Sequence, residues 1–261
     1  MALVTVDDGT RVNVEADSGS SKPALVFSNS LGTDHRLWDP QVAPFRERFR
    51  LIRYDTRGHG KSDAPKGPYS IERLGRDVLA ILDHFEITKT YYCGLSLGGM
   101  TGMWLGVNAG DRLIRLALCD CAARVPAPDA FRQRAATVRG GGMSTIVEGI
   151  LERWFTEPFR KAHPETLVPF RETLLESNPE GYAACCEAIA DMALEETIRK
   201  IKAPTLVLVG ADDVATPPSA AELIHSRIAG SKYALLPNAA HITNVEQAVL
   251  FNKEVMGFLS A

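Results

Sequence analysis

The sequence predicts an α/β protein in which a mostly parallel sheet is flanked by helices and interrupted by a helical insertion. Three observations support this prediction. Short β-branched runs alternate with helical patterns in the first third of the chain, the strand pattern stops after Asp120, and it resumes at Thr205. Alternating strands and helices are typical of βαβ units, which build parallel sheets covered by helices.

The first half of the chain holds six of the expected strands. They are at 3–6, 12–15, 24–28, 51–54, 90–94 and 114–120. Ser70 is expected to cap a helix, because the apolar residues from Ile71 to Phe85 recur at helical spacing and form one stripe. After the insertion we expect strands at 205–210 and 233–236 and helices near 220–228 and 245–259.

The segment 122–200 is expected to form helices separated by Pro and Gly breaks. We therefore predict a core made of residues 1–121 and 201–261, and a helical lid made of residues 122–200. Within the lid, Ser177 and Glu180 form a capping-box pattern that opens a helix.

Composition and charge exclude several classes of function. The 261 residues carry a formal net charge of -3 and no long Lys/Arg run, which argues against a nucleic-acid partner. Asp7, Asp8 and Arg11 interrupt the only apolar stretch near the N-terminus, so we expect neither a signal peptide nor a membrane span, and a cytoplasmic location. The five cysteines lack zinc-type spacing and are expected to be free thiols; Cys93, close to the motif described next, is interpreted as a packing residue.

The strongest chemical signal lies at residues 94–99, which read Gly-Leu-Ser-Leu-Gly-Gly. They follow an expected strand and precede an expected helix at 100–108, which is the context of a G-x-S-x-G nucleophile elbow. Small flanking residues let the backbone turn sharply, and the helix N-terminus favours developing negative charge. Ser96 is therefore the candidate nucleophile, although a serine in such a turn can also act only as a helix cap.

A serine hydroxyl is a weak nucleophile at neutral pH, so a histidine must take its proton and a carboxylate must hold that histidine's tautomer. His241 is the candidate base, because it alone of the six histidines follows the last expected strand, in the loop to the terminal helix. His84 and His225 are interpreted as structural or surface residues of helices, and His163 in the lid could at most touch substrate.

Candidate acids end two of the expected strands. Asp212 and Asp213 close the strand at 205–210, at the carboxyl end of the sheet where ligands gather, and one of them should face His241. Asp120 ends an earlier strand and is the alternative. A turn-capping role is the other interpretation of Asp212.

The tetrahedral intermediate of acyl transfer needs two backbone N–H donors. Leu97 offers one, because it directly follows the nucleophile. The loop 28–32 offers the other, since Gly32 permits the tight backbone approach that points the Leu31 amide inward. An ordinary turn is the alternative interpretation of this loop.

Four segments together resemble the α/β-hydrolase family over essentially the whole chain. They are residues 55–62 (Asp-Thr-Arg-Gly-His-Gly-Lys-Ser), the elbow at Ser96, residues 210–213 and the loop of His241. This resemblance implies the α/β-hydrolase fold, and it implies that the acid is Asp213 and not Asp212.

Three shorter motifs resemble the 3-oxoadipate enol-lactonases of bacterial aromatic catabolism. They are Ser-Asn-Ser-Leu-Gly-Thr-Asp at 28–34, Arg-Trp-Phe-Thr at 153–156 and Asn-Val-Glu at 244–246. Many members of the wider family carry His-Gly where this chain has Asn29-Ser30, and that departure favours the enol-lactonase branch. The resemblance implies hydrolysis of a small anionic enol lactone with an acetate side chain to 3-oxoadipate, with no metal or organic cofactor.

The acetate group of such a substrate needs a cation, because an unpaired buried carboxylate is costly. In the helix expected at 129–139, Arg134 falls beside the inward apolar stripe, whereas Arg132 and Arg139 project to the flank. Arg134 is therefore the candidate substrate-binding residue, with an interhelical ion pair or a surface position as the alternative. Trp154, at the end of the next lid helix, is a candidate wall of the same pocket or a core residue.

Other functions use the same candidate residues. A carbon–carbon bond hydrolase of ring-cleavage products, a general carboxylesterase and a cofactor-free perhydrolase all fit a serine nucleophile on this fold. A small-molecule receptor that keeps the fold and turns its ligand over slowly is an alternative of a different class. Dehalogenases and epoxide hydrolases of the fold are disfavoured, because they use an aspartate nucleophile.

Overall fold

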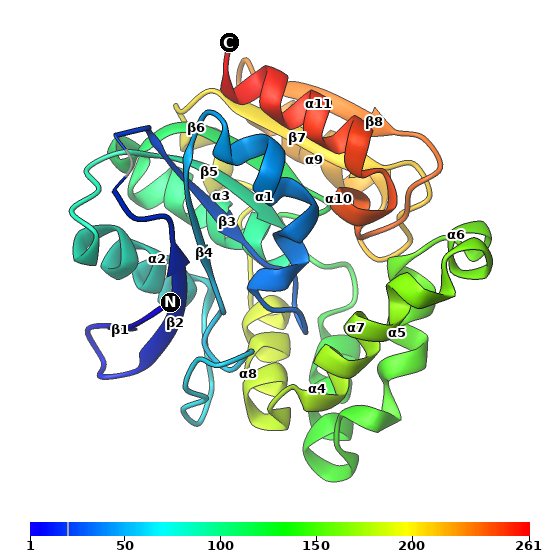
Figure 1. The fold of residues 1–261 in the computed structure, drawn as a ribbon. Helices are drawn as coiled ribbons and strands as arrows, with labels where there is room; N and C mark the ends of the chain where they lie inside the picture. The colour runs from blue at the N-terminus through cyan, green and yellow to red at the C-terminus, as the bar shows by residue number, and fades with distance from the viewer. Residues whose placement is uncertain (20) are drawn as a thin grey trace.

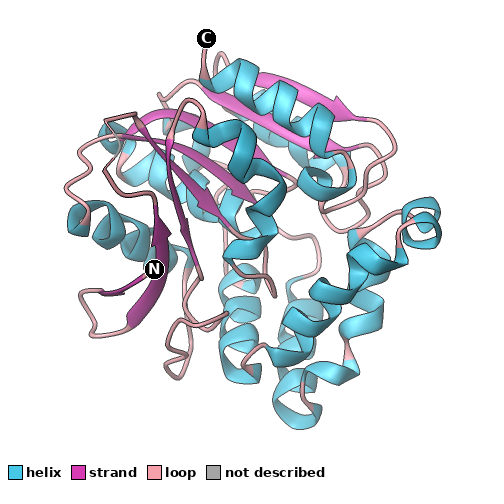
Figure 2. Cartoon of the chain, in the orientation of Figure 1, coloured by secondary structure: helices cyan, strands magenta, loops and turns pink. Residues whose placement is uncertain are grey.

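The structure, a computed structural model, describes residues 1–19 and 21–261. Within these residues one eight-stranded sheet forms the centre of the molecule (Figures 1 and 2). The strands are β1 (Ala2–Thr5), β2 (Arg11–Ala16), β3 (Ala24–Ser28), β4 (Arg50–Tyr54), β5 (Thr90–Leu95), β6 (Leu113–Cys119), β7 (Thr205–Gly210) and β8 (Lys232–Leu236). The strands expected from the sequence are all present, with ends that differ by at most one residue.

The strand order is β1-β2-β4-β3-β5-β6-β7-β8. The pairs β1/β2 and β2/β4 are antiparallel, and the remaining pairs are parallel, from β4/β3 through β7/β8. Strands β3 and β7 are buried along their full length, as expected for central parallel strands that are covered by helices on both faces. The prediction of a mostly parallel sheet is confirmed.

Helices cover both faces of the sheet (Figure 1). Helices α1 (Asp39–Arg46) and α11 (Ala248–Leu259) pack together on one face, while α2 (Ile71–His84), α3 (Leu97–Asn108) and α9 (Pro218–Arg227) lie on the other. Ser70 caps α2, because its hydroxyl accepts a hydrogen bond from the Arg73 amide at 3.0 Å. The core on the α1 side contains Phe27 stacked on Trp38, with ring centroids 4.5 Å apart.

A helical insertion follows β6, as the sequence predicts (Figure 1). Its helices are α4 (Pro128–Gly141), α5 (Val147–Trp154), α6 (Glu157–Ala162), α7 (Pro164–Glu176) and α8 (Pro179–Ala190). Four short 3-10 turns complete the described helical segments: η1 (His35–Trp38), η2 (Gly110–Arg112), η3 (Met143–Thr145) and η4 (Thr197–Lys200). The insertion lies beyond the carboxyl ends of the central strands, where its helices can cover a site at that edge of the sheet.

The capping box predicted at Ser177 and Glu180 is wrong. Asn178 caps α8 instead, and its side-chain oxygen accepts hydrogen bonds from the amides of Glu180 (3.0 Å) and Gly181 (3.1 Å). Pro179 occupies the first helical position, which proline favours, and this shifts the cap to the residue before it. The Glu180 carboxylate pairs with Arg139 of α4.

The terminal helix predicted at 245–259 is two helices. Helix α10 (Thr243–Glu246) ends before Gln247, and α11 begins after it. Gln247 is not helical, with φ of -124° and ψ of 46°, and its side-chain amide donates to the Asn238 carbonyl. The break leaves Glu246 at a helix end, close to the loop of His241.

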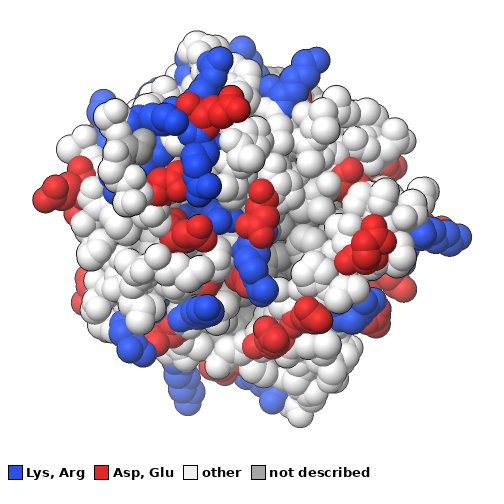
Figure 3. Space-filling model, viewed as in Figure 1, with Lys and Arg blue, Asp and Glu red and all other residues white. Residues whose placement is uncertain are grey.

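Two surface properties bear on possible partners. Acidic and basic side chains are interspersed on the face drawn in Figure 3, which therefore presents no continuous basic field. In the part of the chain that the structure describes, every helix is too short or too polar to cross a bilayer.

Candidate active site

The elbow around Ser96 joins β5 to α3 through a strained turn. Ser96 has φ of +55° and ψ of -114°, a conformation that residues with a Cβ rarely adopt. A Cβ on Gly94 would lie 2.2 Å from the Gly98 carbonyl oxygen, and one on Gly98 would lie 2.1 Å from the Ser28 carbonyl oxygen, so both positions require glycine. The Ser96 hydroxyl makes no capping hydrogen bond to α3 and lines a cavity, which disfavours the interpretation of Ser96 as a helix cap.

His241 and Asp213 form a buried pair at the wall of the same cavity. The imidazole Nδ1 of His241 lies 2.8 Å from Asp213 Oδ2. The carboxylate also accepts hydrogen bonds from the amides of Ala215 and Thr216 and from the Thr216 hydroxyl, which fix its orientation. Burial alone would raise the pKa of Asp213, but the charge of His241 and these hydrogen bonds lower it below its ordinary value. Asp213 is therefore an anion that can hold the histidine tautomer.

The other two candidate acids do not contact His241. Asp212 is exposed. Asp120 is fully buried and accepts hydrogen bonds from the Gly210 amide (2.9 Å) and the Thr243 hydroxyl (2.5 Å). Burial, followed by the charge of nearby Asp213, raises the pKa of Asp120 well above its ordinary value. Of the three candidate acids, Asp213 is therefore the one that pairs with His241 in the structure.

Of the two amides predicted to form an oxyanion hole, that of Leu31 lies in the loop after β3 and that of Leu97 at the start of α3, directly after Ser96. Neither Leu31 nor Leu97 donates its backbone N–H to an acceptor within the described residues. Leu97 is the first residue of α3, where N–H groups have no partner inside the helix. Gly32, with φ of +81°, follows Leu31. The amide of Gly98 donates to the Asn29 carbonyl at 2.9 Å, which joins the first turn of α3 to the loop of Leu31.

The cavity beside Ser96 has a volume of about 250 Å³. Both the core and the insertion contribute to its wall, and most of the wall is apolar. The lining residues from the core include Ser30, Leu31, Ser96, Thr216 and His241, and those from the insertion include Phe131, Arg134, Ile150, Arg153, Trp154 and Tyr182. An apolar pocket with a few convergent polar groups is typical of a small-molecule site.

Two arginines give one part of this cavity a positive charge. Arg134 of α4 lies over the Phe131 ring, with its guanidinium carbon 4.9 Å from the ring centroid. Arg153 of α5 is partly buried, and burial together with the charge of Arg134 lowers its pKa. Within the described residues neither guanidinium forms an ion pair, so their charge is available to a bound anion.

The neighbouring arginines of α4 are engaged elsewhere. Arg132 pairs with Asp129 and Asp191 at the surface. Arg139 pairs with Glu180 and Glu187 of α8. Arg134 is thus the arginine of this helix that reaches the cavity, at the position that the helical periodicity predicts.

Comparison with known proteins agrees with this architecture. A family model described as alpha/beta hydrolase fold matches residues 23–156. The chain belongs to the α/β-hydrolase family. This α/β-hydrolase is 40% identical over 236 residues to 3-oxoadipate enol-lactonase 2 of Acinetobacter baylyi, a match that covers 90% of this chain and 88% of the relative. It is 34% identical to 3-oxoadipate enol-lactonase 1 of the same organism, over 99% of this chain and 97% of the relative.

A solved structure extends the similarity to three dimensions. The crystal structure of the enol-lactonase from Burkholderia xenovorans LB400 is 41% identical to this α/β-hydrolase and superposes with a TM-score of 0.97. The match covers 100% of both chains. The resemblance noted from short sequence motifs therefore extends over the whole length and the whole fold.

Two features at the candidate site of this α/β-hydrolase were not predicted from its sequence. Arg153 entered only as part of a resemblance motif, although Ile150, Arg153 and Trp154 have the i, i+3, i+4 spacing of one helix face. The second feature is backbone: the Trp154 carbonyl accepts hydrogen bonds from the amides of His241 (3.1 Å) and Ile242 (3.0 Å). His163 and His225 are exposed and do not line the cavity.

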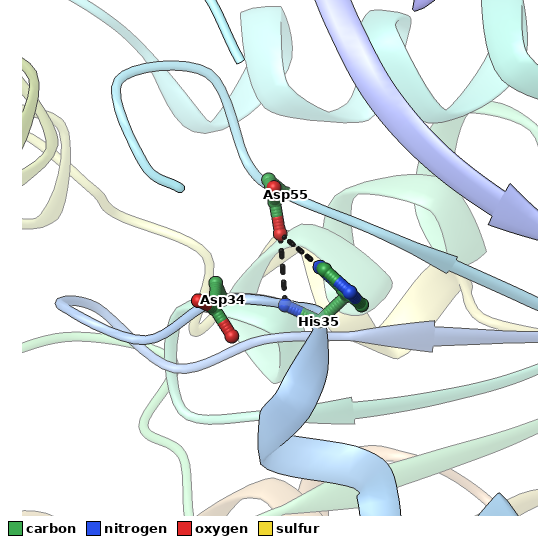
Figure 4. Close-up of side chains that lie close together, drawn as sticks. All are labelled: Asp34, His35 and Asp55. Carbon is green, nitrogen blue, oxygen red and sulfur yellow. Dashed lines mark hydrogen bonds and ion pairs between the residues drawn. The ribbon is translucent and has the colours of Figure 1, made fainter. Parts of the chain in front are cut away.

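A second cluster of polar residues in the α/β-hydrolase lies away from the cavity and comprises Asp34, His35 and Asp55 (Figure 4). Their potential ligand atoms lie within 4.8 Å of one another. Asp34 is already paired with Arg36, and Asp55 accepts hydrogen bonds from the His35 amide and ring and from the side-chain amide of Asn13. We interpret the cluster as a structural tie between two loops, because its oxygens already have donors.

Proposed function

We propose that this chain hydrolyses 3-oxoadipate enol-lactone to 3-oxoadipate through an acyl-enzyme on Ser96. Its full-length similarity to enol-lactonases supports this function. The observation that carries the proposal is the joint presence, in one cavity, of Ser96, His241 and two arginines without acidic partners in the described chain. A lactone that bears a carboxylate needs both a nucleophile and a cation at opposite parts of one small pocket.

In the proposed mechanism each chemical step is assigned to a named side chain or backbone amide. Ser96 attacks the lactone carbonyl, and His241 takes the hydroxyl proton while Asp213 holds the imidazole tautomer. The amides of Leu31 and Leu97 stabilise the negative charge on the carbonyl oxygen. The ring C–O bond then breaks as the protonated His241 gives its proton to the leaving oxygen. The released enol tautomerises to a ketone while it is still attached through the ester to Ser96. His241, neutral again, takes a proton from water as the water attacks this ester, and it returns that proton to the Ser96 oxygen as the ester bond breaks and 3-oxoadipate leaves.

In this proposal the lid of residues 122–200 binds the substrate carboxylate while the core performs the chemistry. Arg134 and Arg153 contact the acetate group, and Trp154 forms an apolar wall beside the ring. The small anionic substrate is recognised by charge at one end and by the oxyanion donors at the other. Cytoplasmic location belongs to the same proposal, because all five cysteines are free and buried, as is usual in reducing compartments.

A substrate panel tests the proposal. We expect kcat/KM to be highest for 3-oxoadipate enol-lactone, lower for neutral lactones and p-nitrophenyl esters, and lowest for a dienoic ring-cleavage product. The Ser96→Ala variant is the control, and it should lose activity on every substrate. A preference for neutral esters would indicate a general carboxylesterase, and a preference for the dienoic compound would indicate a carbon–carbon bond hydrolase. A single turnover per protein molecule would indicate a receptor.

A further inference from the structure

The loop of His241 is attached to the insertion through backbone hydrogen bonds. The amides of His241 and Ile242 both donate to the carbonyl of Trp154, at 3.1 Å and 3.0 Å. Trp154 is the last residue of α5, and the carbonyls of a final helical turn lack partners inside the helix. The histidine loop therefore uses an acceptor that α5 leaves free.

Glu246 joins the same two segments a second time. This side chain lies at the end of α10 and is 8% exposed. Its Oε1 accepts hydrogen bonds from the amide (3.0 Å) and hydroxyl (2.5 Å) of Thr156, just after α5. Its Oε2 accepts a hydrogen bond from the amide of Ala240, the residue before His241. One buried carboxylate thus bridges the histidine loop and the insertion, which lie far apart in sequence but side by side in space (Figure 1).

We propose that Glu246 is a positioning residue that holds His241 in line with Ser96 by fixing its loop to the end of α5. This inference rests on the proposed function, in which His241 accepts the Ser96 proton. The end of α5 also carries Arg153 and Trp154, so the wall that contacts substrate and the loop of the base form one unit. That wall cannot swing open as a lid without displacing His241.

The charge of Glu246 matters because three donors converge on its two oxygens. A glutamine can accept from Thr156 or from Ala240, but its NH2 group then faces the donor of the other residue. Glu246→Gln therefore releases one side of the bridge while the side-chain size is kept. Since small misplacements of catalytic groups cost up to about 100-fold in rate, we expect kcat to fall on the order of 10- to 100-fold, with KM changed much less.

The matched control is Asn244→Ala in the same short helix. Asn244 is fully buried and donates to the Leu37 carbonyl and the Gln41 side chain, on the side of α10 that faces the core. This control should lower the Tm and leave kcat near that of the parent. Glu246→Gln with a lowered Tm and a kcat within about twofold of the parent would overturn the proposal, because a merely structural role predicts that result.

A second pair of variants covers the case in which Glu246→Gln does not fold. Thr156→Val removes the hydroxyl that donates to Glu246 and accepts from the Phe159 amide at the start of α6, whereas Thr156→Ser keeps both bonds. The Thr156 amide bond to Glu246 remains in both variants, so the comparison tests the hydroxyl bond. We expect the valine variant to lose kcat and the serine variant to keep it, and equal kcat values for the two would contradict a positioning role of this bond.

The low-field NMR signal of the proton between His241 Nδ1 and Asp213 gives a readout that needs no substrate. It should shift in Glu246→Gln and stay unchanged in Asn244→Ala. An unchanged signal in Glu246→Gln would overturn the positioning role. Failure of the proposed function would give a different result. The wild-type protein would not turn over the lactone, but the signal would still shift in Glu246→Gln and stay unchanged in Asn244→Ala.

Discussion

The imidazole Nε2 of His59 accepts a hydrogen bond from the Gly32 amide at 2.9 Å, and its Nδ1 lies 3.2 Å from the Arg57 carbonyl. Because a carbonyl only accepts and an amide N–H only donates, the ring must be the neutral tautomer with its proton on Nδ1. Gly32 directly follows Leu31, the proposed oxyanion donor. His59, in the motif at 55–62, therefore supports the loop that carries Leu31.

Stability should depend on pH through His59. Burial lowers the pKa of His59 in the folded chain. Below the pKa of an unfolded histidine, about 6.5, the unfolded chain binds a proton that the folded chain does not, so stability falls as pH falls. His59→Gln keeps an acceptor near Nε2 without the titration, and its free energy of unfolding should depend less steeply on pH between about 6.5 and 5.

Urea unfolding of both proteins at several pH values measures this difference. Other titrating groups are common to the two proteins, including His35, whose pKa is raised first of all by its hydrogen bond to Asp55. The contribution of His35 has the opposite sign, because it is lost as pH rises, and it cancels in the comparison. Identical slopes for wild type and His59→Gln would show that His59 does not carry the effect.

Removal of the nucleophile should separate activity from stability. We expect Ser96→Ala and His241→Ala to lower kcat on the order of 10⁴- to 10⁶-fold, because each removes a chemical role while the oxyanion donors remain. The fold should persist, since the Ser96 hydroxyl makes no capping bond. Steady-state kinetics with far-UV circular dichroism measure both quantities, and activity within about tenfold of the parent would refute the assignment of either residue.

The strained turn at Ser96 leads to a separate prediction on stability. Its φ of +55° is unfavourable for any residue with a Cβ, but glycine adopts it readily. The free energy of unfolding of Ser96→Gly should therefore be about 1 kcal/mol higher than that of Ser96→Ala, although both variants are inactive. Equal stabilities in urea unfolding would indicate that the turn stores little strain.

The three candidate acids should differ sharply when each is changed to asparagine. Asp213→Asn should lower kcat by roughly 10⁴-fold, because an asparagine cannot hold the His241 tautomer or stabilise its charged form. Asp120→Asn should have a small effect on kcat, since Asp120 bonds the Gly210 amide and the Thr243 hydroxyl and does not contact His241. Asp212→Asn should be close to the parent, because Asp212 is exposed.

Kinetics of the three variants at one pH decide between the acids. If Asp120→Asn proves the most damaging, then the acid lies at the end of β6 and the pairing of Asp213 with His241 is not the catalytic one. The ranking does not depend on the identity of the ester substrate. It can therefore be measured with p-nitrophenyl esters if the lactone is scarce.

Local patterns predicted the parts of this protein that depend on neighbours in sequence. The elbow at Ser96 was recognisable because the glycines that its turn requires lie within three residues of it. The choice among Asp120, Asp212 and Asp213 is different, since it depends on which carboxylate faces a histidine at least 28 residues away. Residue chemistry alone left that choice open, and a family resemblance was needed to make it.

The features that the sequence did not predict have three different causes. Glu246 contacts Thr156 across 90 residues of chain, and no periodicity encodes that contact. The cap of α8 was misplaced by one residue because Ser177 and Asn178 are both good caps, and Pro179 decided between them. Arg153 lies on α5 and Arg134 on α4, and the periodicity of one helix does not show that the two arginines line the same cavity.

Substrate charge selection is the property that the two cavity arginines should control. Arg134 and Arg153 come from different helices and line the same cavity without acidic partners in the described residues, so each can bond a bound carboxylate. Arg132 offers a matched control on α4, because it pairs with Asp129 and Asp191 away from the cavity. The Arg132→Ala variant therefore loses an arginine of the same helix that lies outside the proposed site.

We expect Arg134→Ala and Arg153→Ala each to cost about 1.5–3 kcal/mol in kcat/KM for the anionic lactone, as is typical of hydrogen bonds to charged groups. A neutral lactone of the same ring size should lose much less, because it offers no carboxylate to either guanidinium. Arg132→Ala should behave like the parent on both substrates. Kinetics on the two lactones with the three variants provide the measurement. Equal losses on the charged and neutral substrates would mean that the arginines support the packing of α4 and α5, since only a direct contact with the carboxylate makes the loss depend on substrate charge.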